Sequence, residues 1–144
     1  MIEERRFLSL YSDGSSLFPR NENQLSSLII DVTKSQGERP IEEMNILLFT
    51  SIFARCTHLQ YLHFGSSISW YIRLSFLYSP PTCISSNLLE LHLRLGNFID
   101  CLYILDGRFS HLHTFHVDID HIYSLYENTD NKVNLYFDQN VKST

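Results

Sequence analysis

The stretch Ser86–Asp120, SNLLELHLRLGNFIDCLYILDGRFSHLHTFHVDID, contains two copies of one strand pattern separated by a short helical segment. Both copies have the spacing L-x-x-L-x-L, and they begin at Leu88 and Leu112. Successive side chains of a strand point to opposite faces, so Leu91 and Leu93 point one way and the polar residues between them point the other way. A helix between two strands is a crossover connection, which predicts that these strands are parallel neighbours.

The same spacing recurs earlier in the chain and predicts a repeat architecture. Its copies begin at Leu25, Leu59, Leu88 and Leu112, at intervals of 34, 29 and 24 residues, and Leu8 and Leu10 form a partial copy. This is the strand spacing of leucine-rich repeats, whose usual period is about 20–29 residues. We therefore predict a single α/β domain over residues 1–144, a short irregular leucine-rich-repeat-like solenoid with parallel strands on one face and helices on the other. Its repeat strands are expected near residues 7–11, 25–32, 59–64, 88–95 and 112–119.

The connection between the last two repeat strands carries its own helix signals. Asn97 is placed to cap the helix N-terminus, and Gly107 can adopt the left-handed conformation that ends it. Phe98, Leu102 and Leu105 are spaced as one apolar face of this helix.

A longer helix is predicted between the strands near 25–32 and 59–64. Pro40 suits its first turn, and Arg55 suits its last turn, where the helix dipole favours cations. Its apolar stripe consists of Ile41, Met44, Leu48 and Ile52, while Ile46, Phe49 and Phe53 lie off that stripe. Because this helix is apolar on more than one side, we expect it to pack against neighbours beyond its own strand.

Two further segments carry strand signals. Alternation of Ile72, Leu74 and Phe76 predicts a short extra strand that Pro80 and Pro81 end, joined to the preceding strand by a hairpin or by a helix-free arc. Trp70, just before it, is predicted to lie in the core. A final strand is predicted from Val133, Leu135 and Phe137.

Composition and charge are typical of a folded chain and lack nucleic-acid and membrane signals. Hydrophobic residues make up 44% and charged residues 19% of the sequence. The net charge of -5 gives no basic footprint for nucleic acid, and no window approaches the roughly 18 apolar residues of a membrane span. With no signal-peptide features at the N-terminus, we expect a cytoplasmic or nuclear protein without nucleic-acid or membrane partners.

The sequence contains three cysteines, Cys56, Cys83 and Cys101. Because their number is odd and no two form a CxxC pair, we predict that they are buried free thiols.

Three strings go beyond the strand spacing: CTHLQYLHFGSS, YIRLSF and the stretch of residues 80–120. Within that stretch, the run CLYILDGRFSHLHTF at residues 101–115 is far more specific than the spacing. Through them, residues 41–120 resemble the leucine-rich-repeat portion of F-box-like proteins. In that family an N-terminal F-box binds the Skp-type adaptor of a cullin ubiquitin ligase, and the repeats hold the protein to be ubiquitinated. The residues before the first repeat strand do not resemble an F-box. The resemblance thus implies substrate-recognition repeats, with a Skp-type adaptor as partner only if an F-box lies upstream.

Stacking of the strands in register would align their outward residues in rows. The rows are Ile29, His63, His92 and His116; Ser27, Tyr61, Glu90 and Thr114; and Asp31, Gly65, Arg94 and Asp118. Mixed charge with a tyrosine and an arginine is typical of protein-binding surfaces. We therefore predict a non-enzymatic protein-binding scaffold with an unidentified protein partner. Its candidate partner-binding residues are Tyr61, His63, Glu90, His92, Arg94, Thr114, His116 and Asp118.

Metal chemistry is the first alternative reading of these residues. A row of histidines could bind a transition metal or respond to pH, but ligands in a straight row do not converge on one zinc ion, and an extra strand at Leu74 could separate His63 from His92. Residues His111, His113, His116, His121, Asp118 and Asp120 could suggest a metal-dependent hydrolase, although alternation scatters them over both faces and no HExxH motif is present. We predict no metal site, no cofactor and no catalytic residue.

The remaining alternative is a truncated or degenerate copy without independent function. A repeat strand close to Met1 would have no cap before it, whereas terminal repeats of such folds normally need one. This reading predicts a missing upstream segment.

Overall fold

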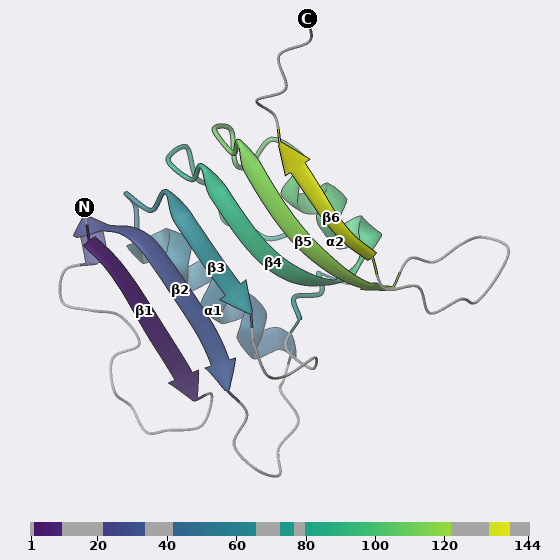
Figure 1. The fold of residues 1–144 in the computed structure, drawn as a ribbon, viewed down its shortest axis with the longest axis horizontal. Helices are drawn as coiled ribbons and strands as arrows, with labels where there is room; N and C mark the ends of the chain where they lie inside the picture. The colour runs from purple at the N-terminus through teal and green to yellow at the C-terminus, as the bar shows by residue number, and fades with distance from the viewer. Residues whose placement is uncertain are drawn as a thin grey trace, which may run out of the picture.

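The computed structural model describes residues 2–9, 22–33, 42–65, 73–76, 80–121 and 133–138. Its elements are β1 (Ile2–Ser9), the 3-10 helix η1 (Glu22–Gln24), β2 (Leu25–Thr33), α1 (Glu42–Arg55), β3 (Tyr61–Gly65), β4 (Glu90–Asn97), α2 (Phe98–Ile104), β5 (Thr114–His121) and β6 (Val133–Asp138). The six strands of the described residues form one sheet in the order of the sequence (Figure 1). Strands β1 to β5 are parallel, and β6 pairs with β5 in the antiparallel sense.

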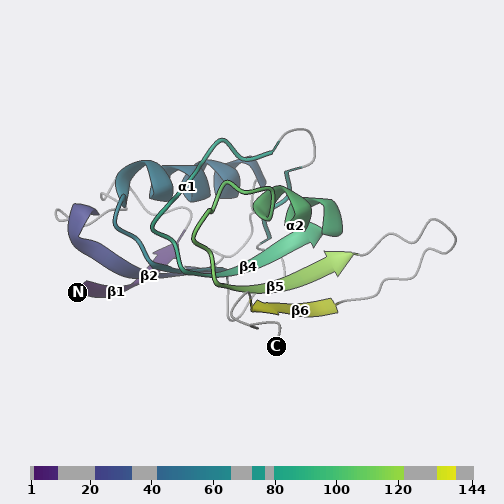
Figure 2. The same cartoon turned by 90° about the horizontal axis from the view of Figure 1, so that it is seen from above.

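The elements form two layers. Figure 2 shows α1 and α2 on the same side of the sheet. The predicted mixed α/β class, with parallel strands and two helices, is confirmed at this level. Each helix lies in a connection between two parallel neighbours, α1 between β2 and β3 and α2 between β4 and β5, as a crossover requires. In the part of the chain that the structure describes, no helix is both long and apolar enough to cross a membrane.

The inward side chains of the strands form one hydrophobic core with the helices. All residues at the leucine positions of the four full copies are buried: Leu25, Leu28, Ile30, Leu59, Leu62, Phe64, Leu88, Leu91, Leu93, Leu112, Phe115 and Val117. Burial of one such side chain contributes about 1.5–3 kcal/mol relative to its exposure. The L-x-x-L-x-L spacing therefore decides which face of each strand turns toward the helices.

The two edge strands differ from the sequence prediction. β1 runs from Ile2 to Ser9 rather than over residues 7–11, because it pairs with β2 along its whole length through backbone hydrogen bonds, which need no leucine. The last strand is present as β6 but is antiparallel, so the expectation of parallel strands fails there. Residues 122–132, which separate β5 from β6, are fewer than the dozen or so that a parallel crossover needs.

Helix α2 begins with the cap that the sequence predicts. The Asn97 side chain accepts a hydrogen bond from the Asp100 backbone N–H at 3.1 Å, and the Asp100 carboxylate accepts one from the Asn97 N–H at 3.2 Å, which forms a capping box. Asp100 is buried and also accepts a hydrogen bond from the Phe76 N–H at 2.7 Å. Gly107 has the predicted left-handed conformation after the helix, with φ of 99°.

The apolar face predicted for α2 is wrong. Phe98, Leu102 and Leu105 are 40%, 51% and 36% exposed, whereas Cys101 and Ile104 are buried against the sheet. The physical reason is the tether of Asp100 to the backbone before the helix, because it fixes how the helix is rotated about its axis.

Helix α1 packs with a broader face than its predicted stripe. Leu48 and Ile52 are buried as expected, but Met44 is 47% exposed, so its place in the stripe is corrected; Ile41 lies outside the described residues. Phe49 and Phe53, predicted off the stripe, are also buried. The Phe49 ring lies 5.1 Å from the Phe53 ring and 5.9 Å from the Phe64 ring of β3, so edge-to-face aromatic contacts join this helix to the sheet.

The extra strand predicted at residues 72–76 is reduced to a single bridge. Leu74 pairs with Leu95 in the parallel sense and continues the sheet beside β4, beyond the point where β3 ends. The Leu74 N–H donates to the Arg94 carbonyl at 2.9 Å, and the Gly96 N–H donates to the Leu74 carbonyl at 2.8 Å. Leu74 runs parallel to β4, which is itself parallel to β3, so the Leu74 segment and β3 do not form a hairpin. Ile72 and Trp70 lie outside the described residues.

The three cysteines are buried free thiols, as predicted. Burial raises the pKa of the Cys83 thiol and of the Cys101 thiol from 9.0 to about 11. Both thiols therefore stay protonated near neutral pH, in a form that is neither nucleophilic nor metal-binding.

Candidate functional site

The strand face turned away from both helices carries all the predicted partner-binding residues. We call this set the outer face: Tyr61 and His63 on β3, Glu90, His92 and Arg94 on β4, and Thr114, His116 and Asp118 on β5. The strand register brings them together in rows, with Tyr61 opposite Glu90 opposite Thr114, His63 opposite His92 opposite His116, and Arg94 opposite Asp118. Their role in binding remains a prediction.

The middle of the outer face is a stack of imidazole rings. The His63 and His92 rings are parallel within 9° with centroids 5.5 Å apart, and the His92 and His116 rings are parallel within 19° with centroids 4.2 Å apart. The Leu74 segment does not separate the first two rings, because β3 and β4 pair directly at these residues. The Tyr61 ring lies 5.3 Å from the His92 ring, so four neighbouring aromatic groups share this surface.

Glu90, at one end of the outer face, contacts the middle ring of the histidine stack. Its carboxylate lies 2.7 Å from His92 Nε2, which makes a hydrogen bond that becomes an ion pair when the imidazole is protonated. The possible ligand atoms of Glu90, His92 and His116 all lie within 4.8 Å of one another. Neither the predicted row of histidines nor the predicted His/Asp cluster includes Glu90, so this group of three was missed. Burial, and next the neighbouring His92, hold the pKa of His116 below its ordinary value.

A charged group lies at the other end of the outer face. The buried Asp120 carboxylate is 3.4 Å from Arg73 Nη1 and 3.2 Å from Arg94 Nε. These ion pairs hold the Arg94 guanidinium beside β5. The sequence did not predict this role for Asp120 or Arg73. The available signal was that Asp120 has the same strand parity as Asp118, which lies opposite Arg94.

A shallow hollow of about 190 Å³ lies over these rows. Its polar lining comes from all three strands, and its lining residues are His63, Phe64, Gly65, His92, Leu93, Arg94, His116, Val117 and Asp118. The outer face is therefore a slightly concave surface with histidines at its centre.

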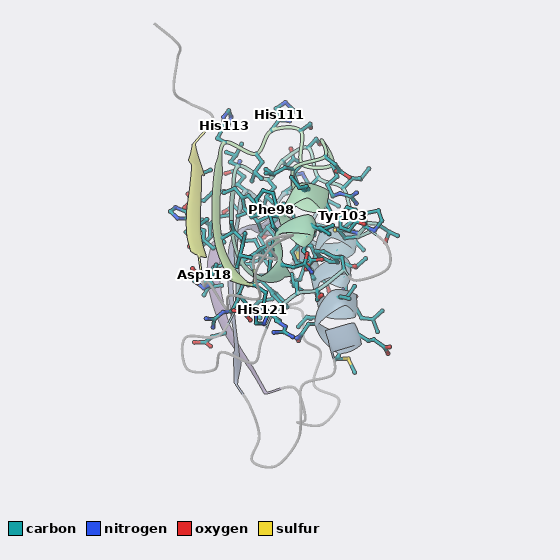
Figure 3. All side chains as sticks on the ribbon, turned by 90° about the vertical axis from the view of Figure 1, so that its right-hand side faces the viewer. Phe98, Tyr103, His111, His113, Asp118 and His121 are labelled. Atoms are coloured by element: carbon teal, nitrogen blue, oxygen red, sulfur yellow. The ribbon has the colours of Figure 1, made fainter. Side chains whose placement is uncertain are left out.

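The other histidines of the predicted His/Asp cluster do not join this surface. Figure 3 shows His111 and His113 at one end of the sheet and His121 near the opposite end. His111 Nδ1 lies 2.6 Å from the Ser86 carbonyl oxygen, in the turn before β5. His111 and His113 are therefore set apart by their place before β5, and not by the alternation that was predicted to scatter the cluster over both faces. Within the strand, His116, Asp118 and Asp120 have the same parity and are not scattered.

The chain matches no protein-family model, and no match to it is found among curated proteins or among solved structures. Its candidate function consequently rests on the outer face and on the resemblance noted in the sequence.

Proposed function

We propose that this chain is a non-enzymatic protein-binding module that holds its partner on the outer face. One observation carries the proposal: eight outward side chains from three adjacent strands lie in register on the side of the sheet away from both helices. The helices and the inward leucines form the core, so these outward residues are available for recognition.

The chemistry of the outer face favours a protein partner. Tyrosine and arginine are enriched among residues that dominate binding energy at protein interfaces, and here Tyr61 and Arg94 stand among groups of both charge signs. Both side chains are partly buried, and both have neighbours that position them, the His92 ring and the Asp120 carboxylate. Side chains that are already ordered lose less entropy on binding, which strengthens an interaction of a given area.

The finer architecture and the cellular role belong to the same proposal. Parallel strands whose leucines alternate inward support a leucine-rich-repeat-like solenoid, in which each strand and its connection form one repeat. The resemblance to F-box-like proteins supports substrate recognition for a ubiquitin ligase. In that case the Skp-type adaptor would be bound by an F-box and not by the outer face.

A quantitative capture experiment tests the proposed surface. The tagged chain is compared with an outer-face variant, Tyr61→Ala/Asp118→Ala, and with a matched helix-side variant, Leu47→Ala/Leu102→Ala, whose residues are 62% and 51% exposed. We expect the outer-face variant to lose captured partner by about tenfold or more, and the helix-side variant to retain it. Thermal unfolding of all three chains checks that the fold is unchanged.

Two outcomes would overturn this assignment. Equal capture by all three chains would remove the outer face as the binding surface. Loss confined to the helix-side variant would move the surface to α1 and α2. The ubiquitin-ligase role has its own readout, because Skp-type adaptor and cullin should co-purify with the tagged product of the native locus.

A further inference from the structure

We propose that Glu90, His92 and His116 form a binding site for one divalent transition-metal ion, with Zn²⁺ as the ion of choice. Their possible ligand atoms already lie within 4.8 Å of one another. This site is independent of the proposed partner-binding role, and it assigns a specific chemistry to the centre of the outer face.

The sheet itself brings the three ligands together. Neighbouring strands lie about 4.8 Å apart, and His92 on β4 is in register with His116 on β5, so the two imidazoles project side by side. Glu90 precedes His92 by two residues on the same strand and therefore projects from the same face. The paired strand backbones thus fix the points from which all three side chains project before any ion binds.

Only side-chain rotation is needed to complete the coordination. A tetrahedral zinc ion with bonds of about 2.0–2.1 Å holds its ligand atoms about 3.3 Å apart. The Glu90 carboxylate and His92 Nε2 are already 2.7 Å apart. The stacked rings of His92 and His116 must turn so that their lone pairs converge. The side chains of Glu90 and His92 are 39% and 23% exposed, which leaves room for that rotation.

The ligand types select the ion. Two imidazole nitrogens and one carboxylate suit Zn²⁺, whereas Mg²⁺ and Ca²⁺ prefer oxygen ligands only. Three protein ligands leave a fourth position for water or for a group of a bound partner. The nearby positive charge of Arg94 is offset by Asp120, so it opposes a bound cation less than an unpaired arginine would.

Zn²⁺ alone is the probe for this site. Calorimetric titration of the full chain with ZnCl₂ should give one ion per chain, and Co²⁺ should give the absorption bands of a low-coordinate complex. Single variants His92→Ala, His116→Ala and Glu90→Gln should each weaken Zn²⁺ binding by about tenfold or more. The matched control His113→Ala, an exposed histidine next to the start of β5, should leave binding unchanged. MgCl₂ should produce no saturable heat.

Folding is checked with the same proteins. Zn²⁺ should raise the unfolding temperature of the parent chain and of His113→Ala, because an ion that binds the folded state stabilises it. It should not do so for the double variant His92→Ala/His116→Ala. The proposal is overturned if the parent chain shows no saturable Zn²⁺ binding, or if the double variant or Glu90→Gln binds as tightly as the parent. Weakening by His113→Ala as large as that by His92→Ala would place the site elsewhere.

Discussion

The two faces of strand β4 carry opposite kinds of residue, although they alternate along one short segment. Inward Leu91, Leu93 and Leu95 are at most 5% exposed and pack in the core. Outward Glu90, His92 and Arg94 are partly exposed and make hydrogen bonds or ion pairs on the outer face. One strand therefore separates the hydrophobic core from the proposed binding surface with a period of two residues. Substitution of an inward residue should therefore lower the free energy of unfolding strongly, and substitution of an outward residue should change it little.

The largest effect is expected for Phe115→Ala on the inward side of β5. The Phe115 side chain is 2% exposed, so its removal leaves a cavity, and the free energy of unfolding should fall by about 3–5 kcal/mol. Urea unfolding followed by circular dichroism measures this change. The adjacent outward variant Thr114→Ala is the matched control and should change stability by less than about 0.5 kcal/mol. Similar losses in both variants would contradict the division between the faces.

The next effect concerns the tether that connects the helix layer to the sheet. Asp100→Ala removes the acceptor of the Phe76 and Asn97 N–H groups and should cost about 2–3 kcal/mol. Urea unfolding also measures this loss. Asp106→Ala, in the turn after α2, should cost much less, because Asp106 is exposed. A loss for Asp100→Ala no larger than that control would mean that α2 does not need the tether.

The buried thiols of Cys83 and Cys101 predict that the stability of the fold depends on pH. Their pKa is about 11 in the folded chain and near the ordinary 9.0 when unfolded, so the unfolded chain loses these protons first as pH rises. The free energy of unfolding should therefore fall as the pH rises from about 9 to about 11. The loss should be on the order of 1 kcal/mol per thiol near pH 10. Urea unfolding at several pH values measures the slope. Cys83→Ala/Cys101→Ala should show a shallower slope, and an identical slope would remove the thiols as its cause.

The smallest effect is expected on the outer face. His63 is exposed, and its contact with the neighbouring His92 ring is a stacking contact at 5.5 Å. His63→Ala should therefore change the free energy of unfolding by less than about 0.5 kcal/mol. A loss comparable with that of Phe115→Ala would show that the histidine stack belongs to the structural core, and it would erase the contrast between the two faces.

Local signals predicted where α2 begins but not its orientation; the helix ends at Ile104, with Leu105 as its C-cap, before the predicted Gly107. Asn97 and Asp100 are three residues apart, which is the spacing of a capping box, so their mutual hydrogen bonds depend only on residues close along the chain. Which side of the helix faces the sheet depends on Phe76, whose N–H donates to Asp100 across 24 residues of sequence. The apolar spacing of Phe98 and Leu102 pointed to the side that is exposed instead.

The sequence predicted which residues make up the candidate site, but it predicted their arrangement only in part. Period-two alternation identified the outward residues, and the repeated leucine spacing gave the register that stacks His63, His92 and His116. The position of the Glu90 side chain beside His92 was not visible, because it depends on side-chain rotation and not on spacing.

The sequence by itself determined which residues of β2 to β5 turn inward and where the short helix begins, because strand alternation and helix capping act between residues close along the chain. Tertiary structure alone decided the antiparallel sense of β6, the ion pairs of Asp120 with Arg73 and Arg94, and the convergence of Glu90 and His116. These features depend on hydrogen bonds, ion pairs and contacts between segments far apart in sequence. Such contacts carry no local signal, since the spacing of leucines fixes neither the direction of an edge strand nor the rotamers of outward side chains.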